Sequence, residues 1–136
     1  MGRYLTIRTG RQTKAQLTVK RSGLIMFRNK LCRDLGLRNG DSVSMLWDDV
    51  ENQLWVWKSS DEDSVRVWGR EGQLHAHSVG LASFLFKLCP WAEETLRLRS
   101  GEKRYLEVID AEAVAIVTRP MGMLMGREVM KEFTDK

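Results

Sequence analysis

The sequence predicts a mainly β fold with short helices, of the β or α+β class, built as a duplicated β-barrel with a C-terminal helix. Short stretches that alternate apolar and polar residues predict the strands, and clusters of Gly, Asn and Asp predict the turns between them. The second half of the chain also repeats a pattern from the first. At 136 residues, with 43% hydrophobic and 29% charged residues, the chain suffices for one domain with a buried core.

In the first half, alternation predicts five strands, at 3–8, 15–20, 24–27, 42–47 and 53–58. A short helix is expected at 29–35, because Leu31 and Leu35 are four residues apart and share a helical face. Asn29 is its expected N-cap, and Gly36 its expected left-handed C-terminal residue. The RSG sequence before the third strand predicts a tight turn in which Gly23 adopts a positive φ.

The second half predicts a similar plan, with strands at 65–68, 73–77, near 81–84, 104–109 and 114–118. A helix is expected to follow the strand near 81–84 and to end at Leu88. Pro120 is expected to stop the last strand, and 121–135 fits a terminal helix. Its apolar residues fall roughly on one side, at Leu124, Val129, Met130 and Phe133.

The expected organisation is two halves that form one interleaved domain. The first half is 1–58, the acidic SSDED linker is 59–63, the second half is 64–119, and the terminal helix or tail is 120–136. Neither half has enough apolar surface to stand alone comfortably at about 55–60 residues. The two sheets are therefore expected to bury their apolar sides against each other.

The repeat rests on two matching blocks. SGLIMFRNKLC (22–32) matches VGLASFLFKLC (79–89) at an offset of 57, and LGLRNGD (35–41) matches LRLRSGE (96–102) at an offset of 61. The apolar pattern then continues in step up to Leu54 and Val56, which face Ala115 and Val117. An ungapped match of this kind indicates duplication; the alternative is two similar helix starts in an unrelated fold.

Positive charge is concentrated at the N-terminal end. Residues 1–40 contain ten Lys or Arg against one acid, Asp34, and therefore carry a charge of +9, whereas residues 41–136 carry −5. Such asymmetry favours a nucleic-acid contact at one end. The alternative is a solvated basic face that binds no partner.

The hairpin, strand, helix and LGLRNGD (35–41) together resemble the swapped-hairpin DNA-binding family of AbrB, SpoVT and MraZ. In that pattern IMFR (25–28) takes the place of the second strand and its end, and NKLCRD (29–34) takes the place of the helix. The resemblance covers 15–58 strongly and 74–118 weakly. It implies a swapped-hairpin β-barrel, and a chain with two copies is similar to MraZ, in which one protomer contains the complete interleaved unit.

The resemblance also implies where DNA is bound. In this family basic residues on the first hairpin, its turn and the helix start contact DNA, and here these positions hold Lys14, Lys20, Arg21, Arg28 and Lys30. Long basic side chains neutralise phosphates, and Arg also reads guanine edges. Arg3, Arg8 and Arg11 are expected to add a basic arm. Because the second copy loses these charges, we expect the first half to lead the contact.

Other residues have competing interpretations. Trp55 and Trp57 share a strand face, where they pack against a neighbouring sheet or subunit or, if exposed, form a base-stacking platform. Packing is favoured. His75 and His77 also share a face, but two histidines without a third ligand are more typical of a polar strand than of a metal site. Cys32 and Cys89 are expected to be buried free thiols.

These observations favour a DNA-binding transcriptional regulator whose partner is duplex DNA. The chain shows no nucleophile elbow, P-loop or zincin motif, so neither an enzyme, a cofactor, a metal nor a small-molecule substrate is expected. No apolar run approaches the roughly 20 residues of a membrane helix. With no signal peptide visible, a cytoplasmic location is expected.

The alternative function is a non-enzymatic protein-interaction or oligomerisation module. It would use the apolar FLFKLCPW sequence (84–91) and the Met-rich tail, in which Met121, Met123, Met125 and Met130 lie. A homo-oligomer is compatible with both functions.

Overall fold

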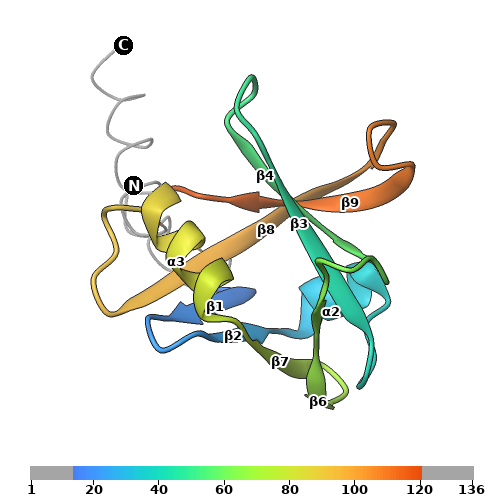
Figure 1. The fold of residues 1–136 in the computed structure, drawn as a ribbon, viewed down its shortest axis with the longest axis horizontal. Helices are drawn as coiled ribbons and strands as arrows, with labels where there is room; N and C mark the ends of the chain where they lie inside the picture. Colours follow the sequence, from blue (N-terminus) through green and yellow to red (C-terminus); the bar gives the residue numbers. More distant parts are fainter. Residues whose placement is uncertain (1–13, 121–136) are drawn as a thin grey trace, which may run out of the picture.

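The two ends of the sheet are made by one short segment of chain. The computed structural model describes residues 14–120, and in this range nine strands pair in the order β5-β3-β4-β9-β8-β1-β2-β7-β6. β5 and β6, at opposite ends of that order, are separated in the chain only by Val67. The sheet therefore curls into a nearly closed barrel (Figure 1). The mainly β fold class is confirmed.

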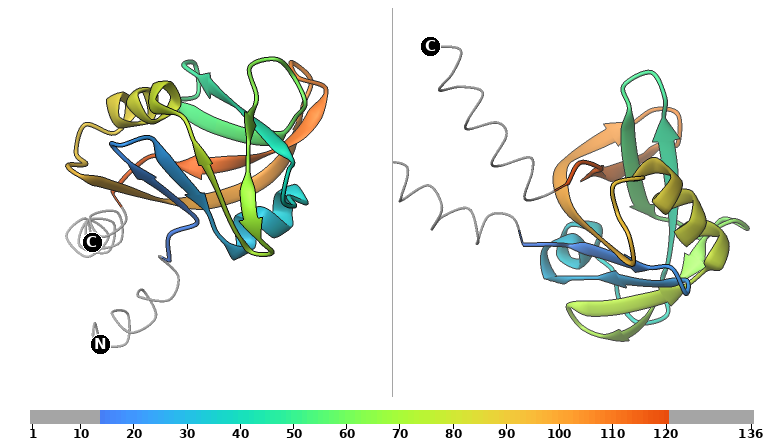
Figure 2. Two further views of the ribbon diagram at one scale, coloured as in Figure 1. Left: turned by 60° about the horizontal axis from the view of Figure 1, so that its bottom comes forward. Right: turned by 90° about the vertical axis from the view of Figure 1, so that its left-hand side faces the viewer.

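The strands pair antiparallel throughout. They are β1 (Leu17–Lys20), β2 (Leu24–Phe27), β3 (Ser42–Asp48), β4 (Gln53–Lys58), β5 (Val65–Arg66), β6 (Trp68–Arg70), β7 (Gln73–His77), β8 (Thr95–Leu106) and β9 (Ala111–Val117). The helices are α2 (Asn29–Leu35) and α3 (Val79–Leu88), on opposite sides of the barrel (Figure 2). No helix among residues 14–120 is long and apolar enough to span a membrane.

The order of elements repeats along the chain. β1-β2-α2-β3-β4 is followed, after the β5 segment, by β6-β7-α3-β8-β9. Equivalent strands pair with each other, β2 with β7 and β4 with β9. The two long hairpins even share a turn detail 58 residues apart, since Asn52 and Asp110 have positive φ values of 54° and 52°.

The residue-by-residue match between the first and second halves that the sequence predicts is wrong. The stretch predicted as a strand near 81–84 belongs to α3, so the offset of 57 matches strand β2 with a helix. The hydroxyl of Ser78 caps this helix by accepting a hydrogen bond from the Leu81 amide at 3.1 Å. The buried residues Ala82, Leu85 and Phe86 follow helical rather than strand spacing. Hydrophobic runs this short do not distinguish a strand from a buried helix.

The second match, at an offset of 61, also joins different structures. LGLRNGD spans the end of α2 and a turn, whereas LRLRSGE (96–102) lies inside β8. β8 begins at Thr95, well before the strand predicted at 104–109, and the tip of its hairpin occupies 107–110. The strand predicted at 65–68 is interrupted at Val67. The predicted strand 3–8 and terminal helix 121–135 lie outside the described residues.

The first half follows its predictions closely. The strands from 15–20 onward and the helix 29–35 occur within two residues of the expected bounds. Gly36 ends α2 in the left-handed region with φ 66°, and Gly23 turns between β1 and β2 with φ 109°. In the NGD turn, a carboxylate oxygen of Asp41 accepts the Arg38 amide at 2.8 Å, and this bond lowers the pKa of Asp41.

The N-terminus of α2 is capped by a residue that the sequence did not indicate. Arg28, not Asn29, occupies the N-cap position, and its side chain makes no capping bond. Instead, Oε1 of Gln16 accepts hydrogen bonds from the amides of Lys30 at 2.9 Å and Leu31 at 3.2 Å. A side chain from the residue preceding β1 thus satisfies two amides at the start of α2.

The core fills the barrel, and a second apolar cluster lies on the opposite side of β4. Leu54 and Val56 point into the barrel, so Trp55 and Trp57 point away from it. Both tryptophans are nevertheless buried, at 2% and 9% exposure. Trp55 lies directly opposite Ala115 of β9. The packing interpretation of these tryptophans is confirmed.

The two thiols are buried and free, as expected. Sγ of Cys32 donates to the carbonyl oxygen of Phe27 at 3.4 Å, and burial raises the pKa of its thiol. Burial also raises the pKa of Cys89, to about 11. Because the thiolate is the reactive form, both groups are protected by position and by protonation.

We predict that replacing Gln16 with Ala lowers the free energy of unfolding by about 1 kcal/mol, because two helix amides lose their acceptor. The matched control is Asn29→Ala. Within residues 14–120 the Asn29 side chain makes no hydrogen bond to the helix, so this change should cost less than about 0.5 kcal/mol. Urea unfolding followed by circular dichroism measures both. A larger loss for Asn29→Ala would contradict the assignment of the cap.

A second prediction concerns the thiols. At pH 7–8 the folded protein should react very slowly with an aromatic disulfide reagent, because neither thiol is exposed or ionised. In guanidinium chloride both should react at once, giving two thiols per chain. Fast reaction of one thiol in the folded state would show that its side of the core opens readily.

Candidate nucleic-acid interface

One side of the barrel wall presents a continuous basic surface. In the strands β8-β1-β2-β7-β6, inward residues such as Leu17, Ile25, Leu74 and Leu96 are almost wholly buried. Side chains alternate along a strand, so the residues between them point outward. We call these outward residues the basic face; its charged and aromatic members are Lys20, Arg28, Arg70, Arg97, Arg99, His75, His77 and Trp68.

Strand register places these side chains side by side. Thr18 of β1 lies opposite both Arg97 of β8 and Met26 of β2. Met26 lies opposite His75 of β7, which lies opposite Trp68 of β6. A single row therefore crosses all five strands, with Arg97 at one end and Trp68 at the other. The left panel of Figure 2 brings the strands β1, β2 and β7 forward.

No carboxylate lies among the outward positions of β1, β2, β7, β6 and the 95–99 part of β8, and the exposed Glu102 further along β8 pairs with Arg104. The remaining outward positions in these ranges are uncharged, and comprise Thr18, Leu24, Met26, Gln73 and Thr95. Glu71, Glu93 and Glu94 lie in the loops at the strand ends. Five Lys and Arg side chains thus share one sheet surface with a positive potential, the electrostatic condition for holding a polyanion.

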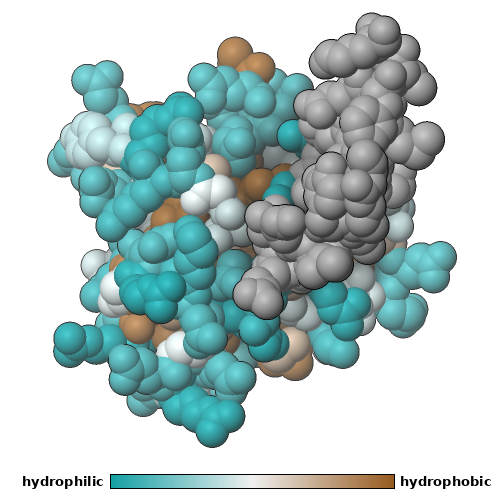
Figure 3. All heavy atoms as spheres, turned by 180° about the vertical axis from the view of Figure 1, so that it is seen from behind, coloured by the Kyte–Doolittle hydropathy of each residue, from teal (hydrophilic) through white to brown (hydrophobic). Residues whose placement is uncertain are grey.

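Other surfaces of the molecule are of ordinary composition. Seen from behind, the described surface is mostly hydrophilic, with apolar residues in scattered patches (Figure 3). On the long hairpins, basic residues are paired with acids: Lys103 with Glu112 at 3.4 Å and Arg104 with Glu51 at 3.6 Å. On these hairpins the charges of Lys103 and Arg104 are thus balanced by ion pairs.

Of the DNA-contacting residues expected from the sequence, the structure places two on this face. Lys20 is exposed and Arg28 half-buried. Lys14 is exposed ahead of β1. Arg8 and Arg11 lie outside the described residues, as does Arg3.

Arg21 has a structural role instead. Its guanidinium lies 4.1 Å from the centre of the Phe86 ring of α3. Its Nη2 donates to the carbonyl oxygen of Ala92 at 3.3 Å, and its Nε donates to that of Glu93. These contacts fasten the β1–β2 turn to α3 and the loop that follows it, so Nε and Nη2 of Arg21 already have acceptors.

Lys30 already forms an ion pair. Its Nζ lies 2.8 Å from a carboxylate oxygen of Asp34, one helical turn further along α2. The pair is solvent-exposed and contributes little to stability, but it neutralises the charge of Lys30 locally. Lys30 is not on an outward position of the five strands.

The basic residues of this face that the sequence did not indicate all come from the second half of the chain. Arg70, Arg97 and Arg99 supply three of the five Lys and Arg charges. The expected loss of charge in the second half followed from the incorrect residue correspondence. The signal was present in TLRLR (95–99), where arginines alternate with the buried Leu96 and Leu98.

His75 and His77 share the outward side of β7, as their spacing predicts. Within residues 14–120, no three His, Cys, Asp or Glu side chains are grouped as a metal site would require. The histidines here contribute polar rings to the basic face.

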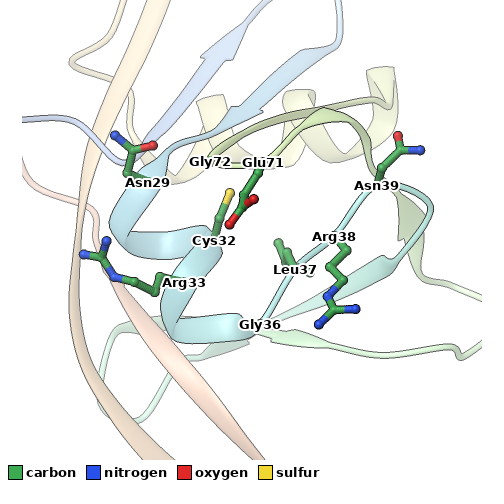
Figure 4. Close-up of a pocket in the computed structure, with 9 residues that line it drawn as sticks. All are labelled: Asn29, Cys32, Arg33, Gly36, Leu37, Arg38, Asn39, Glu71 and Gly72. Atoms are coloured by element: carbon green, nitrogen blue, oxygen red, sulfur yellow. The ribbon is translucent and has the colours of Figure 1, made fainter.

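A pocket of about 740 Å³ opens between α2 and the β6–β7 turn (Figure 4). Arg33 comes from α2, Arg38 from the loop that follows α2, and Glu71 from the β6–β7 turn. The Cys32 side chain forms part of its wall. With both charge signs and a protonated thiol, the pocket brings together neither a nucleophile with a base nor a set of metal ligands.

Comparison with family models, with curated proteins and with solved structures finds no match for this chain, so the geometry of the basic face carries the functional argument.

Proposed function

We propose that this protein is a DNA-binding transcriptional regulator that contacts duplex DNA through the basic face. The observation that carries the proposal is the set of five Lys and Arg side chains that β1, β6, β8 and the residue after β2 place on one side of the barrel wall. Such side chains bind phosphates and release the counterions of DNA. The arginines can also donate two hydrogen bonds to a guanine edge.

Both halves of the chain supply this surface. Lys20 comes from β1 and Arg28 from the residue between β2 and α2, whereas Arg70 comes from β6 and Arg97 and Arg99 come from β8. We therefore propose a single contact surface shared by the halves, in place of one led by the first half alone.

Family membership is part of the proposal. The repeated β-β-α-β-β order and the pairing of equivalent strands support a swapped-hairpin unit of the AbrB, SpoVT and MraZ kind, with both copies in one chain. The two buried free thiols support a reducing compartment such as the cytoplasm.

The second candidate is a protein-interaction or oligomerisation module. It is favoured by the exposure of Phe84 on α3 and Trp91 in the following loop, at 38% and 37%. However, Leu85 and Phe86 of the same apolar run are buried in their own chain. The Met-rich tail lies outside the described residues. This module would show a stable oligomer by light scattering and no affinity for DNA.

We predict that Lys20→Ala and Arg97→Ala each weaken duplex binding several-fold and reduce the salt slope by about 1, because each removes one phosphate contact. The matched control is Lys103→Ala, which removes the same charge from the part of β8 that pairs with β9 and not with β1. Fluorescence anisotropy with a labelled duplex, at several salt concentrations, measures all three variants.

The control should bind nearly as well as the unchanged protein. Equal weakening by Lys103→Ala would show that net charge, and not the basic face, governs binding. An absence of duplex binding at low salt would refute the proposal. Arg21→Ala is not a suitable variant, because it disrupts the contacts with α3 described above.

A further inference from the structure

Trp68 is the tryptophan of the basic face, and it is unusually exposed. Its side chain remains 48% exposed at one end of the row that crosses the five strands. His75 lies directly opposite it on β7, and the guanidinium of Arg66 lies 5.6 Å from the centre of its ring. A large apolar ring thus remains accessible beside Arg66 and His75.

The other described tryptophans are accounted for by packing or hydrogen bonding. Trp55 and Trp57 are buried, and Trp47 packs against the core. Trp91 is partly exposed, but its Nε1 donates to the carbonyl oxygen of Thr118 at 3.2 Å. Within residues 14–120, no hydrogen bond is formed by the Trp68 indole. The fold therefore gives Trp68 no evident structural role that would require a tryptophan.

An exposed aromatic ring among cations suits a nucleobase with a free face. In a duplex both faces of each base are stacked on neighbours, so an indole gains a stacking partner only by unstacking them. In a single strand the base faces are accessible, and aromatic stacking adds to the phosphate contacts of nearby basic residues. The chemistry of Trp68 is therefore matched to unpaired nucleotides.

The dimensions of the face allow both contacts at once. Adjacent strands lie about 4.8 Å apart, so the row from Arg97 to Trp68 spans roughly 19 Å. A strand laid across the sheet can place phosphates near Arg97 and Lys20 while a base reaches Trp68. Leu24 and Met26, half-buried between them, give the face an apolar floor.

We infer that Trp68 stacks on an unpaired base, so that the ligand of the basic face includes single-stranded nucleic acid. This inference rests on the proposed nucleic-acid binding and extends it from duplex to unpaired nucleotides. It assigns the stacking role to Trp68 and not to Trp55 and Trp57, which are buried.

The test compares a labelled 20-nucleotide single strand with the duplex of the same sequence, by anisotropy at one salt concentration with the full chain. Trp68→Ala should raise the Kd for the single strand about tenfold and change the Kd for the duplex by less than about twofold. Trp68→Phe should retain most of the affinity, because a phenyl ring still stacks. Trp91→Ala, which removes the other exposed indole, should leave single-strand binding unchanged.

A second measurement uses the unchanged protein, with Trp68→Phe as its control. Binding of the unlabelled single strand should quench the intrinsic fluorescence, and the quenching should disappear in Trp68→Phe. Equal loss of both nucleic acids in Trp68→Ala, or unchanged single-strand binding and quenching, would overturn the inference, while duplex binding by the unchanged protein would still support the proposed function. If neither nucleic acid binds the unchanged protein, the proposed function itself fails.

Discussion

Closure of the barrel at Val67 is the constraint on which the rest of the structure depends. The backbone amide of Val67 donates to the carbonyl oxygen of Asp41, and its carbonyl oxygen accepts from the Gly40 amide, both at 2.8 Å. Its side chain is fully buried. The residue thereby passes the chain from β5, which pairs with β3, to β6, which pairs with β7. Because both sheet ends belong to one segment, neither remains a long open edge.

Closure also determines what faces the solvent. Once the inward positions of β8, β1, β2, β7 and β6 fill the core, alternation forces their neighbours onto one outer surface. Leu96 and Leu98 are wholly buried, so Arg97 and Arg99 must lie outside. Residues of β1 and β8 are about eighty positions apart in the chain, and the antiparallel pairing of these two strands makes them neighbours. The basic face is thus a consequence of core packing together with the placement of arginine between leucines.

Local sequence patterns predicted the strands, helix and turns of the first half, but they failed to predict part of the second half for physical reasons. Gly36 and Gly23 mark turns that only their positive φ values allow, so their positions were readable from the sequence. The Gln16 cap was not readable, because it depends on β1 lying beside the start of α2. Helix α3 was mistaken in part for a strand because its apolar run is too short for periodicity to decide.

For the candidate site, the sequence identified Lys20 and Arg28 but also proposed Arg21 and Lys30. Only the tertiary structure brings Phe86 beside Arg21, so its engagement was not predictable from neighbours in sequence. Conversely, Arg97 and Arg99 showed a clear strand alternation, and they were overlooked because the second half was matched to the first in the wrong register. The two halves share the same order of strands and helices, although the matching sequence blocks occupy different structures.

The two halves differ in a way that ties them to each other. Trp55 and Trp57 of β4 correspond, 58 residues on, to Ala113 and Ala115 of β9, and Trp55 lies opposite Ala115. Identical halves would place a tryptophan opposite a tryptophan here, and such overpacking is destabilising. Large side chains in one half therefore require small ones in the other. This complementarity favours pairing between the halves of one chain over pairing of two first halves, and so keeps β1 and β2 beside β7 and β8, where the basic face is formed.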